Sequence, residues 1–344
     1  MKKNKKDLAI IGPYPPPLGG ISVHIQRMEY FLRREGIDYT IFDHGFNQNE
    51  HVIPTKKSYL WYIKFLFNKN FKVVHFHYFS KLYYIYGYFF SLINRTPIIV
   101  TLHSQNLIKY NFVIKRIFIF LLKKTRCKQV ITVSKKVSEY LEKNKIKNEY
   151  IPAHVPAMEI NPFKIDKNIL KNRHVILFSS SRIDKHSILN IYNFPIVFDF
   201  IAKHRDRFHL LLLIGEKETR GEYLNTLIAK YKIEDNITIL YEKQLVDYIN
   251  NAFVLLRPNQ EDGYGISIQE SMEMGVPAIA SDVCKRPEGT ILFKNNDFED
   301  MEHKIFYVLN TSKADILKTK QETTYHLQLL NLYKKLIQKK ICKK

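Results

Sequence analysis

Short apolar runs, of the kind that form buried β-strands, recur along the chain and are separated by segments with helical periodicity. The first series comprises residues 8–12, 39–42, 73–77, 98–103, 129–133 and 149–152. The second comprises residues 174–179, 209–214, 236–240, 253–256 and 277–281. Regular alternation of strands and helices is typical of parallel sheets that carry helices on both faces. The sequence therefore predicts an α/β protein with two Rossmann-like, doubly wound parallel-sheet domains that face one cleft.

A proline-rich segment separates the two series of strands. Pro152, Pro156 and Pro162 lie within eleven residues, and proline favours an extended, stiff backbone. We expect this segment to link an N-terminal domain of residues 1–155 to a C-terminal domain of residues 156–321, which suits a length of 344 residues. A last helix is predicted over about residues 322–344, where apolar side chains recur at helical spacing.

The stretch from residue 253 to residue 293 combines a predicted strand, an acidic loop with two glycines and a predicted helix. Gly263 and Gly265 allow backbone N–H groups to approach a ligand closely. The helix N-terminus that follows them favours a negative group such as phosphate. Asp262 precedes the glycines, and Glu270 lies in the helix. This pattern predicts a site for a phosphate-bearing ligand.

A purely structural interpretation of the same stretch is also open. Ser267 and Glu270 have the spacing of a capping box, in which the glutamate only satisfies a backbone N–H group. Gly275, two residues before Pro277, is typical of a helix C-terminus. The complete order of strand, acid, glycines, helix and second strand is much less expected by chance.

Two further loops have the character of phosphate-binding segments. Gly19 and Gly20 follow the first predicted strand and precede a predicted helix at residues 21–34. This loop lacks the G-x-G-x-x-G and Walker spacings, which disfavours a simple dinucleotide-binding domain or a P-loop. After the strand at residues 174–179, Arg182 and Lys185 offer positive charge to a diphosphate. A surface position without function is the alternative for Arg182.

Three histidines lie at or near the ends of predicted strands, where the ligand crevice of a parallel sheet is found. His103 is the candidate functional residue, and a hydrogen-bonded structural role is its alternative. His75 and His77 suggest a metal pair, but no third ligand of suitable spacing is visible, so no metal site is predicted. The three cysteines show neither disulfide-framework nor zinc-site spacing, which fits a reduced, cytoplasmic setting.

Positive charge is concentrated in the first half of the chain. Residues 1–155 hold 26 Lys and Arg against 9 Asp and Glu, out of a total net charge of +21. Residues 56–72 and 107–128 interleave basic with aromatic and aliphatic side chains, as interfacial helices do. A core-facing amphipathic helix with a solvated basic face is the alternative. We expect an anionic membrane surface as partner and no nucleic acid, because no RRM, KH or helix-turn-helix pattern is apparent.

Neither a membrane span nor a signal peptide is predicted. The longest weakly polar run, residues 82–93, is shorter than the ~20 residues that span a bilayer. The apolar run near the N-terminus is too short for a signal peptide and enters the first predicted strand.

The order of features in residues 253–293 resembles the donor-binding signature of the family 4 glycosyltransferases, which have the GT-B fold. Capsule and exopolysaccharide members of this family carry similar R-P-x-x-x-D-G and R-P-E-G stretches, which begin here at Arg257 and Arg286. The resemblance implies that Glu270 holds the ribose of a nucleotide-sugar and that Asp262 holds the sugar. The first acid of the family signature is usually Glu, so Asp262 is a departure from the pattern.

The resemblance also implies roles for the other candidates. It places the Gly19–Gly20 loop beneath the donor phosphates and His103 beside the reacting carbon. The family has an Arg at the place of Arg182 and a Lys about five positions later, where this chain has Ser187, so Lys185 is the candidate replacement. It further implies that the last helix packs back on the first domain. The remaining residues expected to contact the donor nucleotide or its phosphates are Gly215, Glu242, Gly263, Gly265, Ile266 and Ser267.

The function implied is that of a retaining, metal-independent hexosyltransferase of surface polysaccharide biosynthesis, such as capsule synthesis. It would move a sugar from a nucleotide diphosphate sugar, without a further cofactor, to a saccharide carried on a polyprenyl diphosphate. The expected location is the cytoplasm, peripheral at the inner face of the membrane. The alternatives are a nucleotide-sugar epimerase of the same fold, or a non-catalytic basic protein that binds membranes or nucleic acid.

Overall fold

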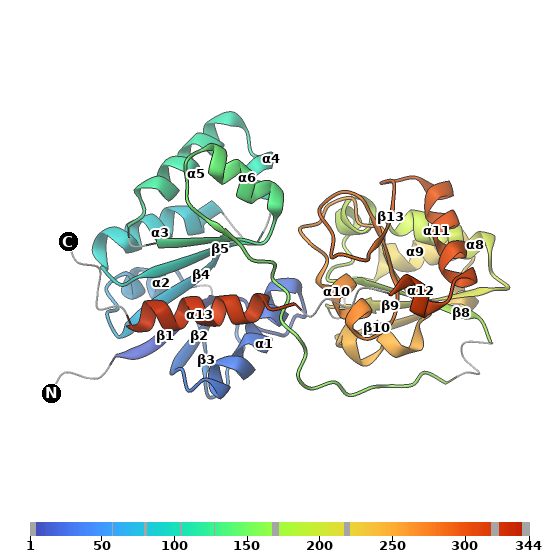
Figure 1. The fold of residues 1–344 in the computed structure, drawn as a ribbon, viewed down its shortest axis with the longest axis horizontal. Helices are drawn as coiled ribbons and strands as arrows, with labels where there is room; N and C mark the ends of the chain where they lie inside the picture. Colours follow the sequence, from blue (N-terminus) through green and yellow to red (C-terminus); the bar gives the residue numbers. More distant parts are fainter. Residues whose placement is uncertain are drawn as a thin grey trace. The chain divides into compact units, whose positions relative to one another are not determined.

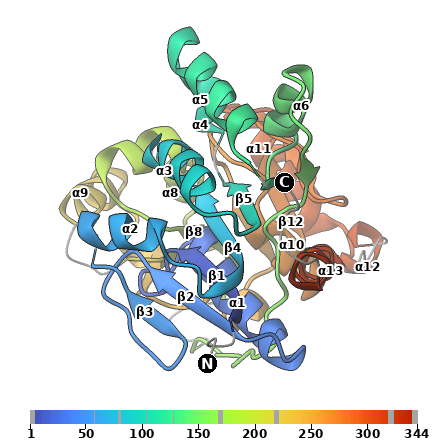
Figure 2. The same cartoon turned by 90° about the vertical axis from the view of Figure 1, so that its left-hand side faces the viewer.

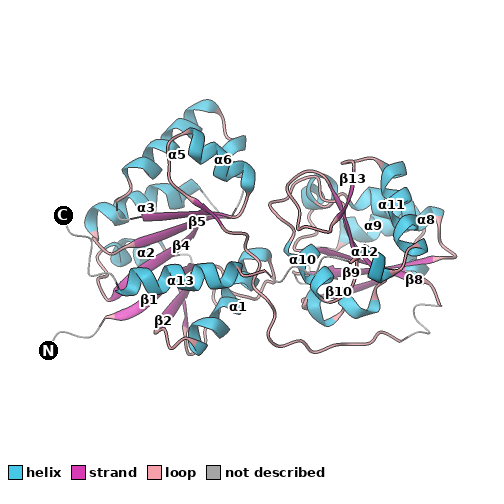
Figure 3. Cartoon of the chain, viewed as in Figure 1, coloured by secondary structure: helices cyan, strands magenta, loops and turns pink. Residues whose placement is uncertain are grey.

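The computed structural model describes residues 5–56, 58–78, 81–103, 105–126, 128–166, 172–216, 221–317 and 323–338. The chain forms two compact units, which Figure 1 colours along the sequence. The first unit contains residues 1–15, 21–155 and 323–344, and the second contains residues 16–20 and 156–322. Each unit has one parallel sheet with helices around it (Figure 3). The predicted α/β architecture with two Rossmann-like sheets is confirmed.

The sheet of the first unit has seven parallel strands in the order β3-β2-β1-β4-β5-β6-β7. Its strands are β1 (Lys6–Gly12), β2 (Tyr39–Asp43), β3 (Val52–Pro54), β4 (Phe71–Tyr78), β5 (Ile98–Leu102), β6 (Lys128–Thr132) and β7 (Glu149–Tyr150). Each apolar run of the first series corresponds to one of these strands. β3 escaped prediction because an edge strand of three residues that ends in proline carries too short a pattern.

Helices cover both faces of the first sheet, as Figure 2 shows. They are α1 (Gly20–Arg34), α2 (Tyr59–Leu66), α3 (Lys81–Ile93), α4 (Asn106–Lys109), α5 (Phe112–Lys124), α6 (Lys135–Lys143) and α13 (Tyr325–Gln338). Helices α1 and α13 bury Leu32 and Tyr333 on the face of β1 that carries Leu8 and Ile10. Helices α2, α3, α5 and α6 pack on the opposite face. Alternate side chains of each strand thus enter different cores, as the pleat requires.

The last helix packs on the first sheet, as the family resemblance implied. Leu329, Leu330 and Tyr333 are buried in the same core as Ile99 and Ile131. Fully burying each aliphatic side chain is worth about 1.5–3 kcal/mol, so this helix contributes substantially to the stability of a unit that lies more than 160 residues away along the chain.

The second unit has a six-stranded parallel sheet in the order β10-β9-β8-β11-β12-β13. Its strands are β8 (His174–Ser180), β9 (Phe208–Ile214), β10 (Ile237–Tyr241), β11 (Val254–Arg257), β12 (Ala278–Ser281) and β13 (Ile291–Phe293). The second series of apolar runs gave five of them. β13 is again a three-residue edge strand that the sequence pattern does not reveal.

Helices of the second unit also form two layers. They are α8 (Phe194–Lys203), α9 (Glu222–Tyr231), α10 (Ile266–Glu273), α11 (Phe298–Asn310) and α12 (Lys313–Ile316), with short helical turns at Ser187–Ile191, Glu234–Asn236, Leu245–Asp247 and Ile249–Asn251. α8, α9 and α11 share a core with Ile176 and Phe178 of β8. α10 packs on the other face with Val175 and Leu177.

The strand order determines where a ligand site is expected. In the second sheet β8 is central, and the chain first adds β9 and β10 on one side and then β11 to β13 on the other. The loops after β8 and β11 therefore diverge at this switch point, which is where open parallel sheets bind ligands beyond the carboxyl ends of their strands. The Arg182 loop follows β8 and the Asp262 loop follows β11.

The basic and aromatic segments of the first unit form helices. Residues 56–72 contain α2, and residues 107–128 contain α5. Among the residues that the structure describes, none of the helices is long and apolar enough to cross a membrane. Residues 151–166, at the proline-rich segment, contain neither helix nor strand.

Candidate functional site

The Pro16–Gly20 segment groups with the second unit, although it precedes α1 in sequence. The backbone N–H of Leu18 donates to the carbonyl oxygen of Gly215, just after β9, at 3.1 Å. A β-carbon added at Gly215 would lie only 2.1 Å from the Leu18 carbonyl oxygen. A β-carbon added at Gly20 would lie 3.9 Å from Cδ1 of Ile266, at the start of α10. The structure thus brings Gly20, Gly215 and Ile266 into one neighbourhood, with Gly19 beside them.

The loop after β8 is held by one hydrogen bond to the end of β9 and by others within the loop. The backbone N–H of Ile183 donates to Glu216 Oε1 at 2.8 Å, which ties this loop to the end of β9. Asp184 accepts the hydroxyl of Ser187 at 2.6 Å, and this hydrogen bond lowers the pKa of Asp184. Arg182 is exposed next to these anchors. A cation on a fixed loop at the carboxyl edge is suited to binding an anion.

Lys185, the predicted replacement for the family lysine, has a defined aromatic neighbour. Its Nζ lies 5.5 Å from the ring centroid of Tyr223, in the first turn of α9. A cation–π contact of this kind at an exposed site is worth about 0.5–1 kcal/mol. A role for Lys185 at a diphosphate stays a prediction. In that role the Lys185 side chain would move from the Tyr223 ring to the ligand.

Asp262 lies between the buried Arg286 and the partly buried Arg257. Arg257 donates through Nε to Asp262 Oδ2 at 2.5 Å and through Nη2 to Oδ1 at 3.1 Å. Arg286 donates through Nη1 to Oδ2, and the backbone N–H of Gly263 donates to Oδ1 at 2.9 Å. Burial raises the pKa of Asp262, but the charges of Arg257 and Arg286 outweigh burial and hold this pKa well below its usual range. Asp262 is therefore ionised and held in a fixed position.

The helix that follows this loop begins after Gly265. Gly265 is the N-cap, with φ of 93°, in the left-handed region that favours glycine. Ser267 is the second helical residue, and its hydroxyl accepts from Arg257 Nη1 at 3.0 Å. The capping-box interpretation is wrong, because Ser267 lies inside the helix. Gly275 does follow the C-terminal end of α10, with its N–H on the Met272 carbonyl oxygen at 3.0 Å.

Gly263, two residues before the N-cap of α10, borders open space, whereas Gly265 itself is buried. A β-carbon added at Gly263 would meet no described atom within 4 Å, whereas one added at Gly265 would lie 2.6 Å from Ile268 Cδ1. Glu270 lies one turn into the helix and is 6% exposed. An open backbone at a helix N-terminus is suited to binding phosphate.

Glu242 lies at the end of β10 in a constrained backbone conformation. Its φ is 53°, which is uncommon for a residue with a side chain. Its N–H donates to the carbonyl oxygen of Ile214 at 2.8 Å. The turn therefore fixes the backbone of Glu242 beside Gly215, where the resemblance implies a nucleotide base.

His103 lies in the first unit, partly exposed beside the buried imidazoles of His24 and His77. His77 Nδ1 and His103 Nε2 are 2.7 Å apart and share a hydrogen bond. The ring centroid of His24, on α1, lies 5.5 Å from that of His77 and 5.8 Å from that of His103. Burial lowers the pKa of His77 and of His103 well below 6.5. Both imidazoles are therefore neutral at pH 7.

His75 has a structural role in the same cluster. Its Nδ1 lies 2.6 Å from the hydroxyl of Tyr333 on α13, and its Nε2 lies 2.8 Å from Thr101 Oγ1 on β5. It thereby joins two strands to the last helix. Among the described residues no group of three or more His, Cys, Asp and Glu side chains is arranged to hold a metal ion.

The predicted site residues thus divide between the two units. Those at the carboxyl edge of the second sheet or on the Pro16–Gly20 segment are Gly19, Gly20, Arg182, Lys185, Gly215, Glu242, Asp262, Gly263, Gly265, Ile266, Ser267 and Glu270. His103 lies in the first unit. Sequence reasoning assigned no role to Arg257 and Arg286, although both belong to the R-P motifs that it singled out.

Two family models match successive parts of the chain. The model described as Glycosyltransferase Family 4 matches residues 18–155, and the model described as Glycosyl transferases group 1 matches residues 174–311. A curated relative, the O-antigen chain mannosyltransferase RfbU of Salmonella typhimurium, is 26% identical over 195 residues. That match covers 54% of this chain and 52% of RfbU, so it spans about half of either protein.

Solved structures show the same fold over nearly the whole chain. A glycosyltransferase from Rickettsia africae has a TM-score of 0.69 at 18% identity and covers 97% of this chain and 100% of its own. Anabaena Alr3699/HepE, solved in complex with UDP-glucose, has a TM-score of 0.72 at 13% identity, covering 95% of this chain and 99% of its own. These structures show the GT-B fold of the chain. The two family models, which together account for most of the residues, show that the chain belongs to the family 4 glycosyltransferases.

Proposed function

We propose that the chain is a retaining, metal-independent glycosyltransferase that uses a nucleotide diphosphate sugar as donor and builds a surface polysaccharide. The proposal rests on the groups that lie at the carboxyl edge of the second sheet. There the Gly19–Gly20 loop lies near the start of α10, and the exposed Arg182 follows Ser181, which lies near Gly215. This arrangement supports a diphosphate site. The relatives support it, since HepE was solved with UDP-glucose and RfbU is named for the O-antigen chain.

The leaving diphosphate is the group whose charge this site would stabilise. Removal of one preorganised hydrogen-bond donor from a site where charge develops typically lowers the rate by a factor of about 10²–10³. Arg182 and the backbone N–H groups of Ile266 and Ser267 supply such donors without a metal ion. Glu270 would bind the ribose hydroxyls. The role that the resemblance gives to His103, beside the reacting carbon, stays a prediction.

Transfer itself is tested with purified protein, a panel of UDP- and GDP-sugars and a polyprenyl-diphosphate-linked saccharide. The proposal predicts release of nucleotide diphosphate that depends on the acceptor, and a product whose anomeric configuration matches that of the donor by NMR. Conversion of the donor sugar without an acceptor would instead identify an epimerase. Release with none of the donors would contradict the proposal.

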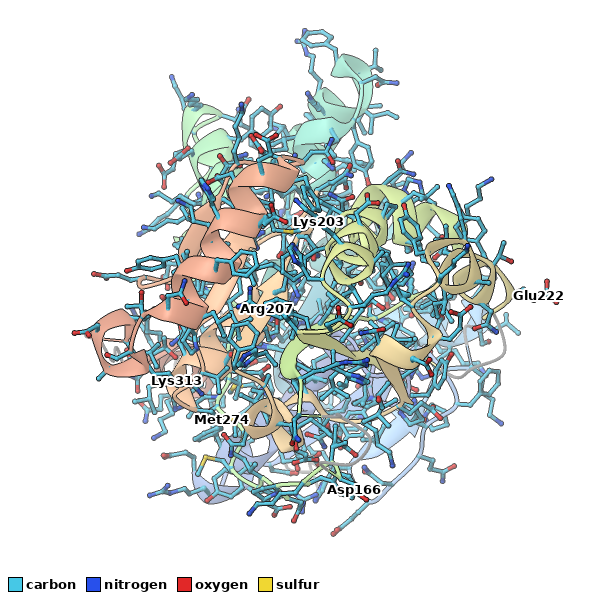
Figure 4. The ribbon with its side chains drawn as sticks, turned by 90° about the vertical axis from the view of Figure 1, so that its right-hand side faces the viewer. Asp166, Lys203, Arg207, Glu222, Met274 and Lys313 are labelled. Carbon is cyan, nitrogen blue, oxygen red and sulfur yellow. The ribbon has the colours of Figure 1, made fainter. Side chains whose placement is uncertain are left out.

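Arg182→Ala is the informative variant, and Arg207→Ala is its matched control. Arg207, labelled in Figure 4, precedes β9 at the amino edge of the same sheet and lies with Cζ 4.9 Å from the Phe306 ring centroid. Loss of activity in Arg182→Ala but not in Arg207→Ala supports a diphosphate site at the carboxyl edge. Equal effects in the two variants would count against it.

We also propose that the first unit binds an anionic membrane, where a lipid-linked acceptor would be found. Helices α2, α3 and α5 pack on one face of the first sheet, with α3 in contact with α2 and α5, and they expose large apolar side chains. The exposed apolar residues of α5 and α2 are Phe112, Val113, Ile117, Phe120, Tyr59, Leu60 and Ile63. Arg116 and Lys124 lie over the rings of Phe112 and Phe120. Exposed apolar and basic side chains on one helix are typical of interfacial binding.

Vesicle flotation tests this attachment. The protein is expected to float with vesicles that contain phosphatidylglycerol and to stay in solution with pure phosphatidylcholine vesicles, because the basic residues need anionic lipid. The variant Phe112→Ser/Phe120→Ser should weaken flotation, whereas Tyr307→Ser, at another exposed aromatic residue in the second unit, should not. Equal flotation with both vesicle types would contradict an electrostatic contribution.

A further inference from the structure

We infer that Asp262 is a positioning residue, clamped by Arg257 and Arg286, which holds the Gly263–Gly265 loop in place for the donor diphosphate and does not itself contact the donor sugar. The inference rests on the proposed function, and it departs from the role that the family resemblance gives to the first acid of the motif. Arg257, Asp262 and Arg286 are called the clamp below.

The acceptor positions of the Asp262 carboxylate are already occupied by protein donors. A carboxylate offers about four acceptor positions. Four N–H groups already donate to Asp262, from Nε and Nη2 of Arg257, from Nη1 of Arg286 and from the backbone of Gly263. The side chain of Asp262 is only 11% exposed. A sugar hydroxyl would have to displace one of these donors and leave a buried guanidinium group unsatisfied, which is unfavourable.

The guanidinium group of Arg286 is held in place by Ser281. Its side chain is 1% exposed, and Nε and Nη2 donate to the carbonyl oxygen and the hydroxyl of Ser281 at 3.0 and 3.1 Å. Ser281 ends β12, so the guanidinium group is anchored to the sheet. The remaining Nη1 points to Asp262, and a β-carbon added at Gly265 would lie 3.2 Å from it. Arg286 thus connects the end of β12 to Asp262 at the start of the loop and lies beside Gly265 at its end.

Arg257 provides the matching connection on the other side. It ends β11, binds Asp262 through two nitrogens and donates through Nη1 to the hydroxyl of Ser267 in the first turn of α10. One carboxylate therefore joins the ends of β11 and β12 to the loop between them and, through Arg257, to the helix N-terminus. A rigid supporting shell of this kind keeps backbone N–H groups aimed at a ligand.

Binding of a nucleotide with and without its sugar distinguishes the two roles. Titration calorimetry would compare UDP with UDP-glucose, and GDP with GDP-mannose, for the wild type, Asp262→Asn and Arg286→Met. The clamp supports the phosphate-binding loop, so each variant should lose about tenfold to a hundredfold in affinity for the nucleotide and its sugar alike, since hydrogen bonds to charged groups are worth about that factor. Loss confined to the nucleotide-sugars would overturn the inference and restore Asp262 as a sugar contact.

Asp262→Glu gives a second, independent readout. Glu is the usual residue of the family signature, so a sugar-binding role predicts that this variant keeps its KM for donor and its kcat. The clamp predicts that the extra methylene group does not fit between two anchored arginines and that KM rises. A variant with wild-type kinetics would overturn the inference.

A ligand-free measurement keeps the inference separate from the proposed function. If the wild type binds neither nucleotide, the proposed function fails, and the clamp is judged by hydrogen exchange. Arg286→Met should then accelerate exchange of the amides of residues 263–266. Glu302→Gln, which removes the negative charge that Glu302 presents to Lys203 and His204 near the amino edge, should leave these amides unchanged and controls for general loss of stability. Unchanged exchange in Arg286→Met would contradict the clamp.

Discussion

Gly215→Ala should weaken nucleotide binding by displacing the loop at Pro16–Gly20. The new β-carbon would lie 2.1 Å from the carbonyl oxygen of Leu18 and 3.2 Å from Cα of Ser181, and both are backbone atoms. Since ordinary contacts of this kind begin near 3.4 Å, the loop must move by more than 1 Å. The hydrogen bond from Leu18 N–H to the Gly215 carbonyl oxygen, now 3.1 Å, would then be lost.

The magnitude follows from these two effects. Overpacking costs typically 1–3 kcal/mol, and a net hydrogen bond is worth about 1 kcal/mol. Suppose that about 2 kcal/mol of this cost is needed to return the loop to its binding position. The affinity for UDP or GDP then falls by roughly 30-fold, because 1.4 kcal/mol corresponds to a factor of ten. Titration calorimetry measures this directly.

Gly263→Ala is the control for Gly215→Ala. It distinguishes steric displacement of the Pro16–Gly20 loop from the replacement of a glycine as such. Gly263→Ala places a β-carbon where no described atom lies within 4 Å, so its melting temperature should equal that of the wild type. Gly215→Ala should melt lower and bind less tightly. Wild-type affinity in Gly215→Ala would refute the assignment of the Pro16–Gly20 segment to the donor site.

Three further predictions concern acid stability, the last helix and metal ions. Burial lowers the pKa of His24 and of His44 to about 4, and it lowers those of His75, His77 and His103 well below 6.5. The unfolded chain therefore binds more protons than the folded one below about pH 6.5, and the melting temperature should fall as the pH drops from 7 to 5. A melting temperature independent of pH over this range would contradict the burial of the cluster. Tyr333→Phe removes the 2.6 Å contact with His75 and should cost about 1–3 kcal/mol in urea unfolding, because a buried imidazole nitrogen loses its partner. Activity should be unchanged in EDTA, whereas a loss that Mg²⁺ or Mn²⁺ restores would contradict metal-independent transfer.

The sequence predicted most of the fold because parallel strands that are buried on both faces leave continuous apolar runs. All the central strands were found in this way. The edge strands at Val52–Pro54 and Ile291–Phe293 were missed, since three residues carry no distinguishable period. The start of α10 was placed incorrectly by the capping-box interpretation, because Ser267 and Glu270 have the right spacing but Gly265 supplies the turn.

The contacts of the site depend on pairs that are distant in the sequence. Arg286 lies 24 residues from Asp262, and only the pairing of β12 with β11 brings the two side chains together. The contact of Leu18 with Gly215 spans nearly 200 residues. Local patterns identified residue types that suit a diphosphate, but they carry no information about which donor satisfies which acceptor. The family resemblance implied that Asp262 is a sugar ligand, whereas its contacts favour a supporting role.

Titration of the purified protein with UDP and GDP tests whether the carboxyl edge of the second sheet binds a donor nucleotide. We expect that one of the two binds to a single site, that Arg182→Ala and Glu270→Ala weaken this binding by at least about tenfold, and that Arg207→Ala does not. Absence of binding by both nucleotides, or binding that is equal in all three variants and the wild type, would contradict a donor site at the carboxyl edge of the second sheet.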